Sequence, residues 1–217
     1  MHSGTKTESI QRNQMRAIEL YETRLEIGFE LLQKFKSMDE IGEFAGKIQE
    51  DCSDFLSIRG TGWLYRATDD IGNQIGIASP TPDRPPLHTP REEHNNAVHW
   101  MKKNGAIARR DNSFFCYNNP YDTENFDHVY GNRIYSVVPI NGFHYTWFDG
   151  VNDFTMQGPK AGRYDTMDEF AKDHPIHVDE GLSHALSNPD NSPEILIQGR
   201  CYFIQESIFE DMFKDKL

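Results

Sequence analysis

Three polar side chains, far apart in the chain, stand where their types and surroundings could support chemistry. Glu194 follows the polar loop Asn191-Ser192-Pro193 and directly precedes the aliphatic run Ile195-Leu196-Ile197. That run is typical of a buried strand, so we expect the Glu194 carboxylate at the mouth of a core. A carboxylate fixed at a strand edge beside a loop suits the stabilisation of a developing positive charge. The alternative is an ordinary solvated glutamate at the start of a strand.

The other two are Arg66 and Ser113. Arg66 follows the strand-like stretch Trp63-Leu64-Tyr65, and alternation along a strand places Leu64 and Arg66 on the same face. If Leu64 faces the core, Arg66 is carried inward and needs an anion, either a ligand or a structural acid of the chain itself. Ser113 lies between the basic pair Arg109-Arg110 and the strand-like pair Phe114-Phe115.

Length and charge limit the classes of protein to consider. A chain of 217 residues fits one domain, or one domain with a helical appendage. The net charge of -12 excludes passive binding to bulk nucleic acid or to anionic membranes, but not an enzyme that acts on nucleic acid through a local basic groove. No apolar run approaches the length of a membrane span, and the N-terminal residues lack the hydrophobic region of a secretion signal. We therefore expect a protein that works in a cytoplasm.

Several common kinds of site are not indicated. The three cysteines form no CxxC pair, which favours reduced core thiols, although a nucleophilic Cys116 is left open. The nine histidines form no HExxH motif and do not pair with cysteines at zinc-finger spacing, so we expect no metal. The chain also lacks GxSxG, GxxxxGK[ST] and GxGxxG, which excludes the usual hydrolase elbow and phosphate-binding loops.

The elements that must position these residues indicate an α+β fold, because helices come first and strands gather in the second half. Apolar periodicity over 8–56 predicts two amphipathic helices, separated by a capping box at Ser37-Met38-Asp39-Glu40; their apolar faces dock on the domain or bind a partner. We predict irregular structure over 79–90, a helix from Thr89 to about Lys103, and a short helix or ordered loop over 121–130. Further predictions are a hairpin of 134–139 and 144–148 around Asn141-Gly142, helices starting at Thr166 and spanning 179–186, and a strand over 194–204.

In order and rough spacing, four stretches resemble the arginine–serine–glutamate class of ADP-ribosyltransferases, the toxin-like branch found in bacteria and phages. They are Leu64-Tyr65-Arg66-Ala67, Asn112-Ser113-Phe114-Phe115, Tyr130-Gly131 and Glu194-Ile195-Leu196. The resemblance spans residues 58–205 and leaves out the N-terminal helices. It implies a core of two packed, mainly antiparallel sheets over 58–217, with 1–57 as an N-terminal helical segment packed on it, in one domain overall.

The resemblance also implies a reaction. Such enzymes cleave the bond between nicotinamide and ribose in NAD+ and transfer ADP-ribose to an acceptor through an oxocarbenium-like cation, as in glycoside hydrolysis. A carboxylate that faces this cation, here Glu194, stabilises the transition state more than the ground state. By resemblance Arg66 binds the diphosphate or the nearby ribose, and the Ala67 backbone meets the nicotinamide carboxamide.

Further roles follow from the same resemblance. Ser113, next to Asn112, would hold the nicotinamide ribose and orient Glu194, and Tyr130 would form an aromatic wall of the nicotinamide pocket or belong to the core. Two positions depart from the family pattern. Asn112-Ser113-Phe114 stands where Ser-Thr-Ser is common, and Ser192 occupies the acceptor-side position where many members carry Glu or Gln. The second departure argues against arginine as the acceptor.

The sequence thus favours an NAD+-dependent mono-ADP-ribosyltransferase that releases nicotinamide and modifies a protein or nucleic acid. It would be a toxin or effector, cytoplasmic or delivered to a host cytoplasm, with NAD+ as substrate and no metal. An antitoxin or inhibitor partner is left open. The alternatives are an NAD+ glycohydrolase, in which water is the acceptor, and a non-enzymatic binding module on the same fold.

Overall fold

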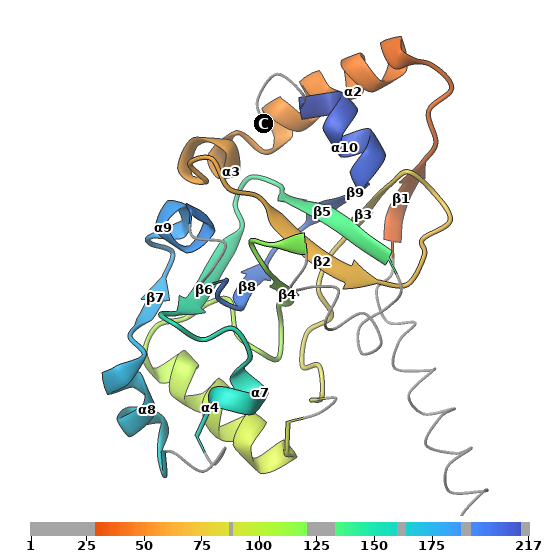
Figure 1. The fold of residues 1–217 in the computed structure, drawn as a ribbon. Helices are drawn as coiled ribbons and strands as arrows, with labels where there is room; N and C mark the ends of the chain where they lie inside the picture. The colour runs from red at the N-terminus through yellow and green to blue at the C-terminus, as the bar shows by residue number, and fades with distance from the viewer. Residues whose placement is uncertain (1–28, 87–88, 121–132, 160–163, 188–191, 214–217) are drawn as a thin grey trace, which may run out of the picture.

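Two antiparallel β-sheets form the centre of the molecule (Figure 1). The computed structural model describes residues 29–86, 89–120, 133–159, 164–187 and 192–213. The five-stranded sheet has the order β1-β3-β9-β5-β2, with strands β1 (Phe29–Gln33), β2 (Leu64–Thr68), β3 (Ile75–Ala78), β5 (Arg133–Pro139) and β9 (Cys201–Gln205). The four-stranded sheet has the order β4-β8-β6-β7, with strands β4 (Phe114–Cys116), β6 (His144–Phe148), β7 (Ile176–Val178) and β8 (Ile195–Gln198). The prediction of an α+β fold with two antiparallel sheets is confirmed.

Helices cover the outer faces of both sheets. Their bounds are α2 (Met38–Asp51), α3 (Ser53–Ile58), α4 (Arg91–Lys103), α7 (Phe154–Gln157), α8 (Met167–Asp173), α9 (Leu182–Ser187) and α10 (Glu206–Phe213). Figure 1 shows α2 and α10 over the five-stranded sheet and α4, α7 and α8 at the other end of the molecule, beside the four-stranded sheet. Within the described ranges, no helix has the length and apolar character needed to cross a bilayer.

Two predicted helix starts are confirmed. Ser37 Oγ accepts a hydrogen bond from the Glu40 backbone N–H at 3.3 Å, so Ser37 caps α2 as predicted. The Glu40 carboxylate reaches back to the Lys36 N–H at 2.9 Å, one residue before the N–H that a standard capping box uses. Thr166 caps α8 in the same way, accepting from the Glu169 N–H at 3.2 Å. Both caps need contacts only three or four residues apart, which explains why the local sequence was sufficient to predict them.

The predicted first helix is wrong over residues 29–33, and its earlier part lies outside the described residues. Residues 29–33 form β1, which pairs with β3 in a register that joins Phe29 to Ala78 and Gln33 to Ile75. The strand β3 supplies backbone partners from forty residues away, and such tertiary pairing overrides a helical pattern of apolar side chains. Helices α2 and α3 replace the predicted second helix.

The predicted hairpin is also wrong, although its turn forms. Gly142 has a φ of 83°, and the strands before and after it end where we expected. The two strands diverge into different sheets, because β5 pairs with β2 and β9 while β6 pairs with β7 and β8. The predicted strand over 194–204 divides in the same manner at Gly199, whose φ of 132° separates β8 from β9.

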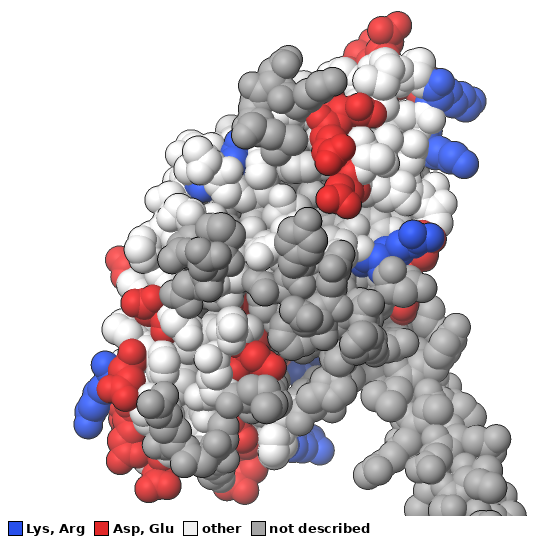
Figure 2. Space-filling view, in the orientation of Figure 1, with Lys and Arg blue, Asp and Glu red and all other residues white. Residues whose placement is uncertain are grey.

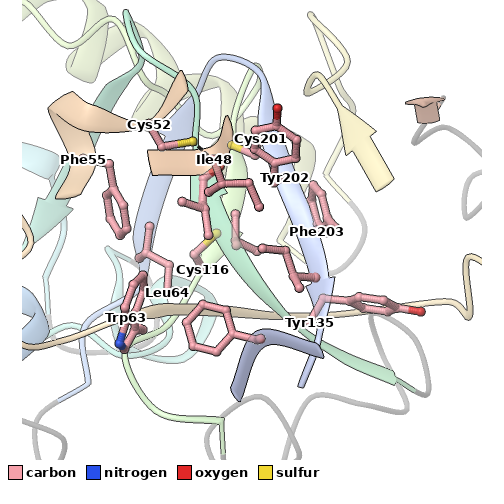
Figure 3. Packing of buried hydrophobic residues seen from close by; sticks show 14 of the residues in the cluster. Ile48, Cys52, Phe55, Trp63, Leu64, Cys116, Tyr135, Cys201, Tyr202 and Phe203 are labelled. Carbon is pink, nitrogen blue, oxygen red and sulfur yellow. Dashed lines mark hydrogen bonds between the residues drawn. The ribbon is translucent and has the colours of Figure 1, made fainter. Parts of the chain in front are cut away.

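The main core lies between the two sheets and continues under α2 and α10. It includes Phe114 and Ile195 from the four-stranded sheet and Leu64 and Phe203 from the five-stranded sheet. Figure 3 shows the three cysteines, Cys52, Cys116 and Cys201, among large apolar side chains of this core. All three are buried free thiols. Burial raises the pKa of Cys116 to about 12, so this thiol stays protonated and is a poor nucleophile.

A second, smaller cluster fills the opposite face of the four-stranded sheet. Phe115, Phe148 and Leu196 point from the sheet into this cluster and meet Ala97 and Met101 of α4 and Phe170 of α8. Successive side chains of β4 and β8 therefore alternate between the two clusters, as expected for strands that are covered on both faces. We call the face toward the five-stranded sheet the inner face, and the face toward α4 the outer face.

Candidate functional site

The strand pairing brings the three predicted segments next to one another. Strand β2 carries Arg66, β4 begins directly after Ser113, and β8 begins directly after Glu194. Strands β4 and β8 are paired along their length. Strands β2 and β4 are joined by one bridge, in which the Tyr65 N–H donates to the Tyr117 carbonyl at 2.7 Å and the Tyr117 N–H donates to the Tyr65 carbonyl at 2.9 Å. The order β2-β4-β8 thus connects the two sheets.

Arg66 points into the space between the sheets, as the alternation with Leu64 predicted. Its residue is only 6% exposed, and its Nη1 donates to the Phe115 carbonyl oxygen at 2.8 Å. The guanidinium also lies 5.7 Å from the centre of the Phe114 ring, which belongs to the inner cluster. Through these contacts Arg66 joins β2 of the five-stranded sheet to β4 of the four-stranded sheet.

Ser113 and Asn112 form the turn that leads into β4. The Ser113 hydroxyl donates to Asn112 Oδ1 at 3.2 Å, and the same oxygen accepts from the Arg109 N–H at 2.8 Å. The register pairs Phe114 with Ile197, so Ser113 lies about 13 Å along the strand from Glu194 at a rise of 3.3 Å per residue. The Ser113 hydroxyl therefore does not orient the Glu194 carboxylate in this arrangement.

Glu194 is buried at the start of β8 on the outer face. Its residue is 7% exposed, and its N–H donates to the Val151 carbonyl at 2.8 Å, which fixes the backbone. The carboxylate accepts a hydrogen bond from Nη1 of Arg110 and forms an ion pair with it. Arg110 is 5% exposed, so both charges of this pair are removed from water. The prediction that Glu194 sits at the mouth of a core, away from open solvent, agrees with this position.

Aromatic rings hold the arginine of this pair. The Arg110 guanidinium lies 4.5 Å from the centre of the Phe154 ring and 4.9 Å from that of Phe115. The Arg84 guanidinium lies 4.4 Å from the centre of the same Phe115 ring, and its Nη2 donates to the Arg110 carbonyl at 3.4 Å. Two arginines thus share the Phe115 ring of the outer face, and one of them, Arg110, pairs with the buried Glu194 carboxylate.

Burial determines the protonation of the groups around this pair. It raises the pKa of Glu194 above the usual value of a glutamate, Asp153 adds to this effect, and Arg110 opposes it by favouring the ionised form. Burial, together with the positive charges of Arg110 and Arg84, lowers the pKa of His94 to about 4, and Asp111 opposes this shift. At neutral pH His94 is therefore an uncharged imidazole.

A hollow of about 190 Å³ lies beside the ion pair, between the loop before α4 and the N-terminal part of that helix. Its polar lining comes from both segments and from the loop after α4, and comprises Asp83, Arg84, Arg91, His94, Asn95 and Asp111. Arg84 is the direct link between the hollow and Arg110. The hollow and the Glu194–Arg110 pair together form the outer-face site.

The remaining predicted residues have different positions. Ala67 is buried in β2 and pairs with Ile134 of β5, away from the outer face. Ser192, on the predicted acceptor side, is 3% exposed, and its hydroxyl has no hydrogen-bond partner among the described residues. Tyr130 lies outside the described residues. The structure thus brings Glu194, which closely follows Ser192 in the sequence, into contact with Arg110. Arg66 and Ala67 lie apart from this pair.

Sequence reasoning missed Arg110, Arg84 and His94 as members of a site. The basic pair Arg109-Arg110 was visible in the sequence, but nothing there distinguished the two arginines. In the structure Arg109 bonds its neighbour Asp111 at 3.2 Å, whereas Arg110 reaches Glu194, eighty-four residues away. The aromatic residues that follow Ser113 were the available signal, because Phe115 provides the ring that receives both Arg84 and Arg110.

The charge on the visible surface is mostly acidic. Figure 2 shows Asp and Glu side chains gathered over the α2 and α10 region and at the opposite end of the molecule, while the described Lys and Arg side chains are scattered. The face shown therefore offers no continuous basic surface among its described residues. This distribution agrees with the net charge of -12.

The chain has no match among known proteins in three comparisons. Neither family models, nor curated proteins, nor solved structures show a significant similarity to it.

Proposed function

We propose that this protein is an NAD+-dependent mono-ADP-ribosyltransferase of toxin or effector type, with Glu194 as its reactive carboxylate. The observation that carries the proposal is the buried Glu194 at the start of β8, whose carboxylate accepts from Arg110 and whose backbone N–H donates to the Val151 carbonyl. The order of the neighbouring strands β2-β4-β8, which hold the segments of the resemblance, supports it. Arg84, which lines the hollow, donates to the Arg110 carbonyl and so links the hollow to the arginine that pairs with this carboxylate.

The proposed reaction breaks the bond between the ribose C1′ and the nicotinamide nitrogen. The bonding electron pair leaves with nicotinamide, which becomes neutral, and the ribose develops a positive charge. The Glu194 carboxylate faces this charge and stabilises it more in the transition state than in the substrate. An acceptor nucleophile then bonds to C1′ and gives its proton to solvent or to a nearby base. Atoms and charges balance without a metal or a redox cofactor.

Arg110 acts as a positioning residue in this proposal. Its guanidinium lies between the rings of Phe115 and Phe154 and donates a hydrogen bond to the carboxylate, and its charge favours the ionised form of Glu194 against the effect of burial, which raises the pKa. The assignment of the NAD+ diphosphate to Arg66 stays a prediction. The outer-face arginines are better placed for a phosphate group near Glu194, because Arg84 contacts the Arg110 carbonyl and lines the hollow.

The direct test is the release of nicotinamide from NAD+ and the fate of the ADP-ribose. The protein is incubated with NAD+ labelled in the adenosine part and with cell lysate, and the product is treated separately with protease and with nuclease. We expect label on a macromolecule, and Glu194→Gln should lower nicotinamide release by a hundredfold or more, as is typical when a transition-state contact is removed. Glu43→Gln, on the exposed face of α2, is the matched control and should retain the wild-type rate.

Each other outcome has a clear meaning. Label that ends as free ADP-ribose assigns NAD+ hydrolysis, the alternative in which water is the acceptor. Folded wild-type protein that releases no nicotinamide with any lysate overturns the enzymatic proposal and favours a binding module. Equal rates for the wild type and Glu194→Gln would remove Glu194 from the reaction.

A further inference from the structure

The acceptor of the proposed reaction must lose a proton as it bonds to the ribose. Glu194 is poorly suited to take that proton, because its buried carboxylate accepts from Arg110 and is assigned to the developing positive charge. Reactions at a sugar carbon commonly divide such tasks between two carboxylates, one at the sugar and one at the incoming nucleophile. The outer-face site therefore needs a second base within reach of Glu194.

The loop between β6 and α7 brings a second carboxylate, that of Asp153, to this place. The Val151 carbonyl accepts from the Glu194 N–H at 2.8 Å, and the Phe154 ring lies 4.5 Å from the Arg110 guanidinium. Asp153 stands between Val151 and Phe154 in the sequence, and two residues of extended chain span at most about 7 Å. The backbone of Asp153 is thus held close to both members of the ion pair.

Hydrogen bonds within the loop fix this position. The Gln157 side-chain oxygen accepts from the Asn152 N–H at 2.9 Å and from the Asp153 N–H at 3.2 Å, and the Gln157 N–H donates to the Asp153 carbonyl at 2.9 Å. Phe154 packs with Met101 of α4 in the cluster of the outer face, where Figure 1 shows α7 beside α4. A loop held in this way suits a group that must meet a reactant in one orientation.

Asp153 and Glu194 differ in environment. Burial is the largest cause of the raised pKa of Glu194, and the negative charge of Asp153 adds to it while Arg110 opposes both. Asp153 is only partly buried, so it can pass a proton to solvent. It also interacts with other groups of the chain, but a carboxylate has about four lone-pair positions and can accept a further hydrogen bond. Two acids in contrasting environments are typical of sites in which one stays charged and the other transfers protons.

A separate observation points to a ligand beside Glu194. Ser192 is 3% exposed, and its hydroxyl oxygen is buried without a hydrogen-bond partner among the described residues. Because Ser192 precedes a proline, its backbone favours an extended conformation, in which side chains two positions apart lie on the same side of the chain. Buried hydroxyls nearly always have a partner, so a polar group of a bound molecule next to Glu194 would satisfy this one.

We propose that Asp153 is the general base that takes the proton of the acceptor. This inference rests on the proposed function. The bond from C1′ to the nicotinamide nitrogen breaks, and its electron pair leaves with nicotinamide. A lone pair of an acceptor O–H or N–H group bonds to C1′, and the acceptor proton passes to the Asp153 carboxylate. Asp153 then releases that proton to solvent and returns to its ionised form, so atoms and charges balance.

The test separates the cleavage of NAD+ from the capture of ADP-ribose. Nicotinamide release and label on macromolecules are measured in the same lysate reaction. We expect Asp153→Asn to lower the label by about a hundredfold or more, the contribution typical of a positioned general base. Nicotinamide release should stay within about threefold of the wild type, because Glu194 still stabilises the cation and water captures it. Glu194→Gln should instead lower both quantities together.

Two variants serve as controls. Asp149→Asn removes the same charge from an exposed position of the same loop and should change neither quantity. Asp153→Glu retains a carboxylate and should recover part of the transfer that Asp153→Asn loses.

A second measurement needs no turnover. In protein with carbon-13 in its glutamate carboxyl groups, the Glu194 resonance of Asp153→Asn should titrate at a lower pH than that of the wild type, because a neighbouring negative charge is gone. Asp149→Asn should leave this titration unchanged.

Three results overturn the inference while nicotinamide release by the wild type still supports the proposed function. They are wild-type transfer in Asp153→Asn, an equal loss of label and nicotinamide in that variant, and a Glu194 titration that the substitution does not move. Wild-type protein that releases nicotinamide but labels no macromolecule would remove the transfer step and, with it, this role of Asp153. Failure of the proposed function itself is seen as wild-type protein that releases no nicotinamide, which would overturn both proposals.

Discussion

The two faces of the four-stranded sheet each hold a buried arginine, and the two arginines are used differently. On the inner face, Arg66 donates to the Phe115 carbonyl and lies among apolar side chains of the main core. On the outer face, Arg110 pairs with the Glu194 carboxylate beside a hollow that reaches the surface loops. The same residue type is thus a strand connector on one face and the partner of a buried acid on the other.

The difference shows that burial alone does not identify a functional arginine. Arg66 and Arg110 are exposed to the same small extent, so the partner and the neighbouring space distinguish them. The partner described for Arg66 is a backbone carbonyl oxygen, which every fold offers. The partner of Arg110 is the buried Glu194 carboxylate, whose pKa is raised and whose removal from water destabilises the folded protein, so stability alone does not explain its presence. The outer face is therefore where we propose the reaction, and the following predictions test that contrast.

The largest effect is expected from breaking the outer-face ion pair. Arg110→Ala leaves the Glu194 carboxylate buried without its cation, and we expect the free energy of unfolding to fall by about 3–5 kcal/mol. Urea unfolding measures this loss. The double variant Arg110→Met with Glu194→Leu should recover most of it, because no charge then stays buried.

Arg133→Ala is the matched control for that experiment. Arg133 pairs with Asp70 at 3.6 Å, and both side chains are largely exposed, so the free energy of unfolding should change by less than about 1 kcal/mol. A loss of similar size in Arg133→Ala and Arg110→Ala would contradict the view that the buried pair is energetically distinct.

A smaller effect is expected from His94, and it depends on pH. The pKa of His94 is lowered from 6.5 to about 4 in the folded protein. Between these values the unfolded chain binds a proton that the folded chain does not, so the free energy of unfolding should fall as the pH falls from 6.5 to 4, by on the order of 2–3 kcal/mol in total. Below about pH 4 both states are protonated and the contribution no longer changes.

Thermal or urea unfolding of His94→Gln across this pH range checks the prediction. The variant should lose the part of the pH dependence that His94 causes, and His99→Gln, on the exposed side of the same helix, should retain it. Parallel pH curves for the wild type and His94→Gln would show that the imidazole is not buried in its neutral form.

The smallest effect is expected from Ser113. Its hydroxyl donates to Asn112 within one turn, so Ser113→Ala should lower the free energy of unfolding by about 0.5–1.5 kcal/mol and change nicotinamide release by less than about threefold. A hundredfold loss of release in a stably folded Ser113→Ala protein would instead support the role on the nicotinamide ribose that the resemblance implies.

Local signals in the sequence predicted much of the fold. The caps at Ser37 and Thr166, the end of α4 at Lys103 and the strand around Arg66 all follow from interactions within a few residues. The strands β3 and β7 and the helix α7 were missed because each is too short to show a periodic pattern. The helix α10 was missed although its buried residues Ile208, Phe209 and Phe213 recur at helical spacing. The partition of β5 and β6 between two sheets could not be predicted, since it depends on pairing with β9 and β8 from the far end of the chain.

The candidate site was also predicted only in part, because local sequence signals show which residues are buried but not which residues they contact. The burial of Glu194 follows from the aliphatic run after it, and the inward direction of Arg66 follows from strand alternation. The partner of each charge was not predictable, because a buried ion pair is chosen by the tertiary fold. The sequence pattern paired Arg66 with Glu194 in one site. In the structure Arg66, on β2 of the five-stranded sheet, contacts β4 beside the Phe114 ring of the main core, whereas Glu194 lies on the outer face of the four-stranded sheet with Arg110.

The most direct test compares nicotinamide release in Arg110→Lys and Arg66→Lys, measured side by side at a temperature where circular dichroism shows both variants to be folded. Lysine keeps the charge in each case and loses the planar pair of donors. We predict that Arg110→Lys lowers the rate by at least about tenfold while Arg66→Lys keeps it within about threefold of the wild type. The reverse result, a rate that collapses in Arg66→Lys and survives in Arg110→Lys, would place the reaction on the inner face and contradict the proposed role of the Glu194–Arg110 pair.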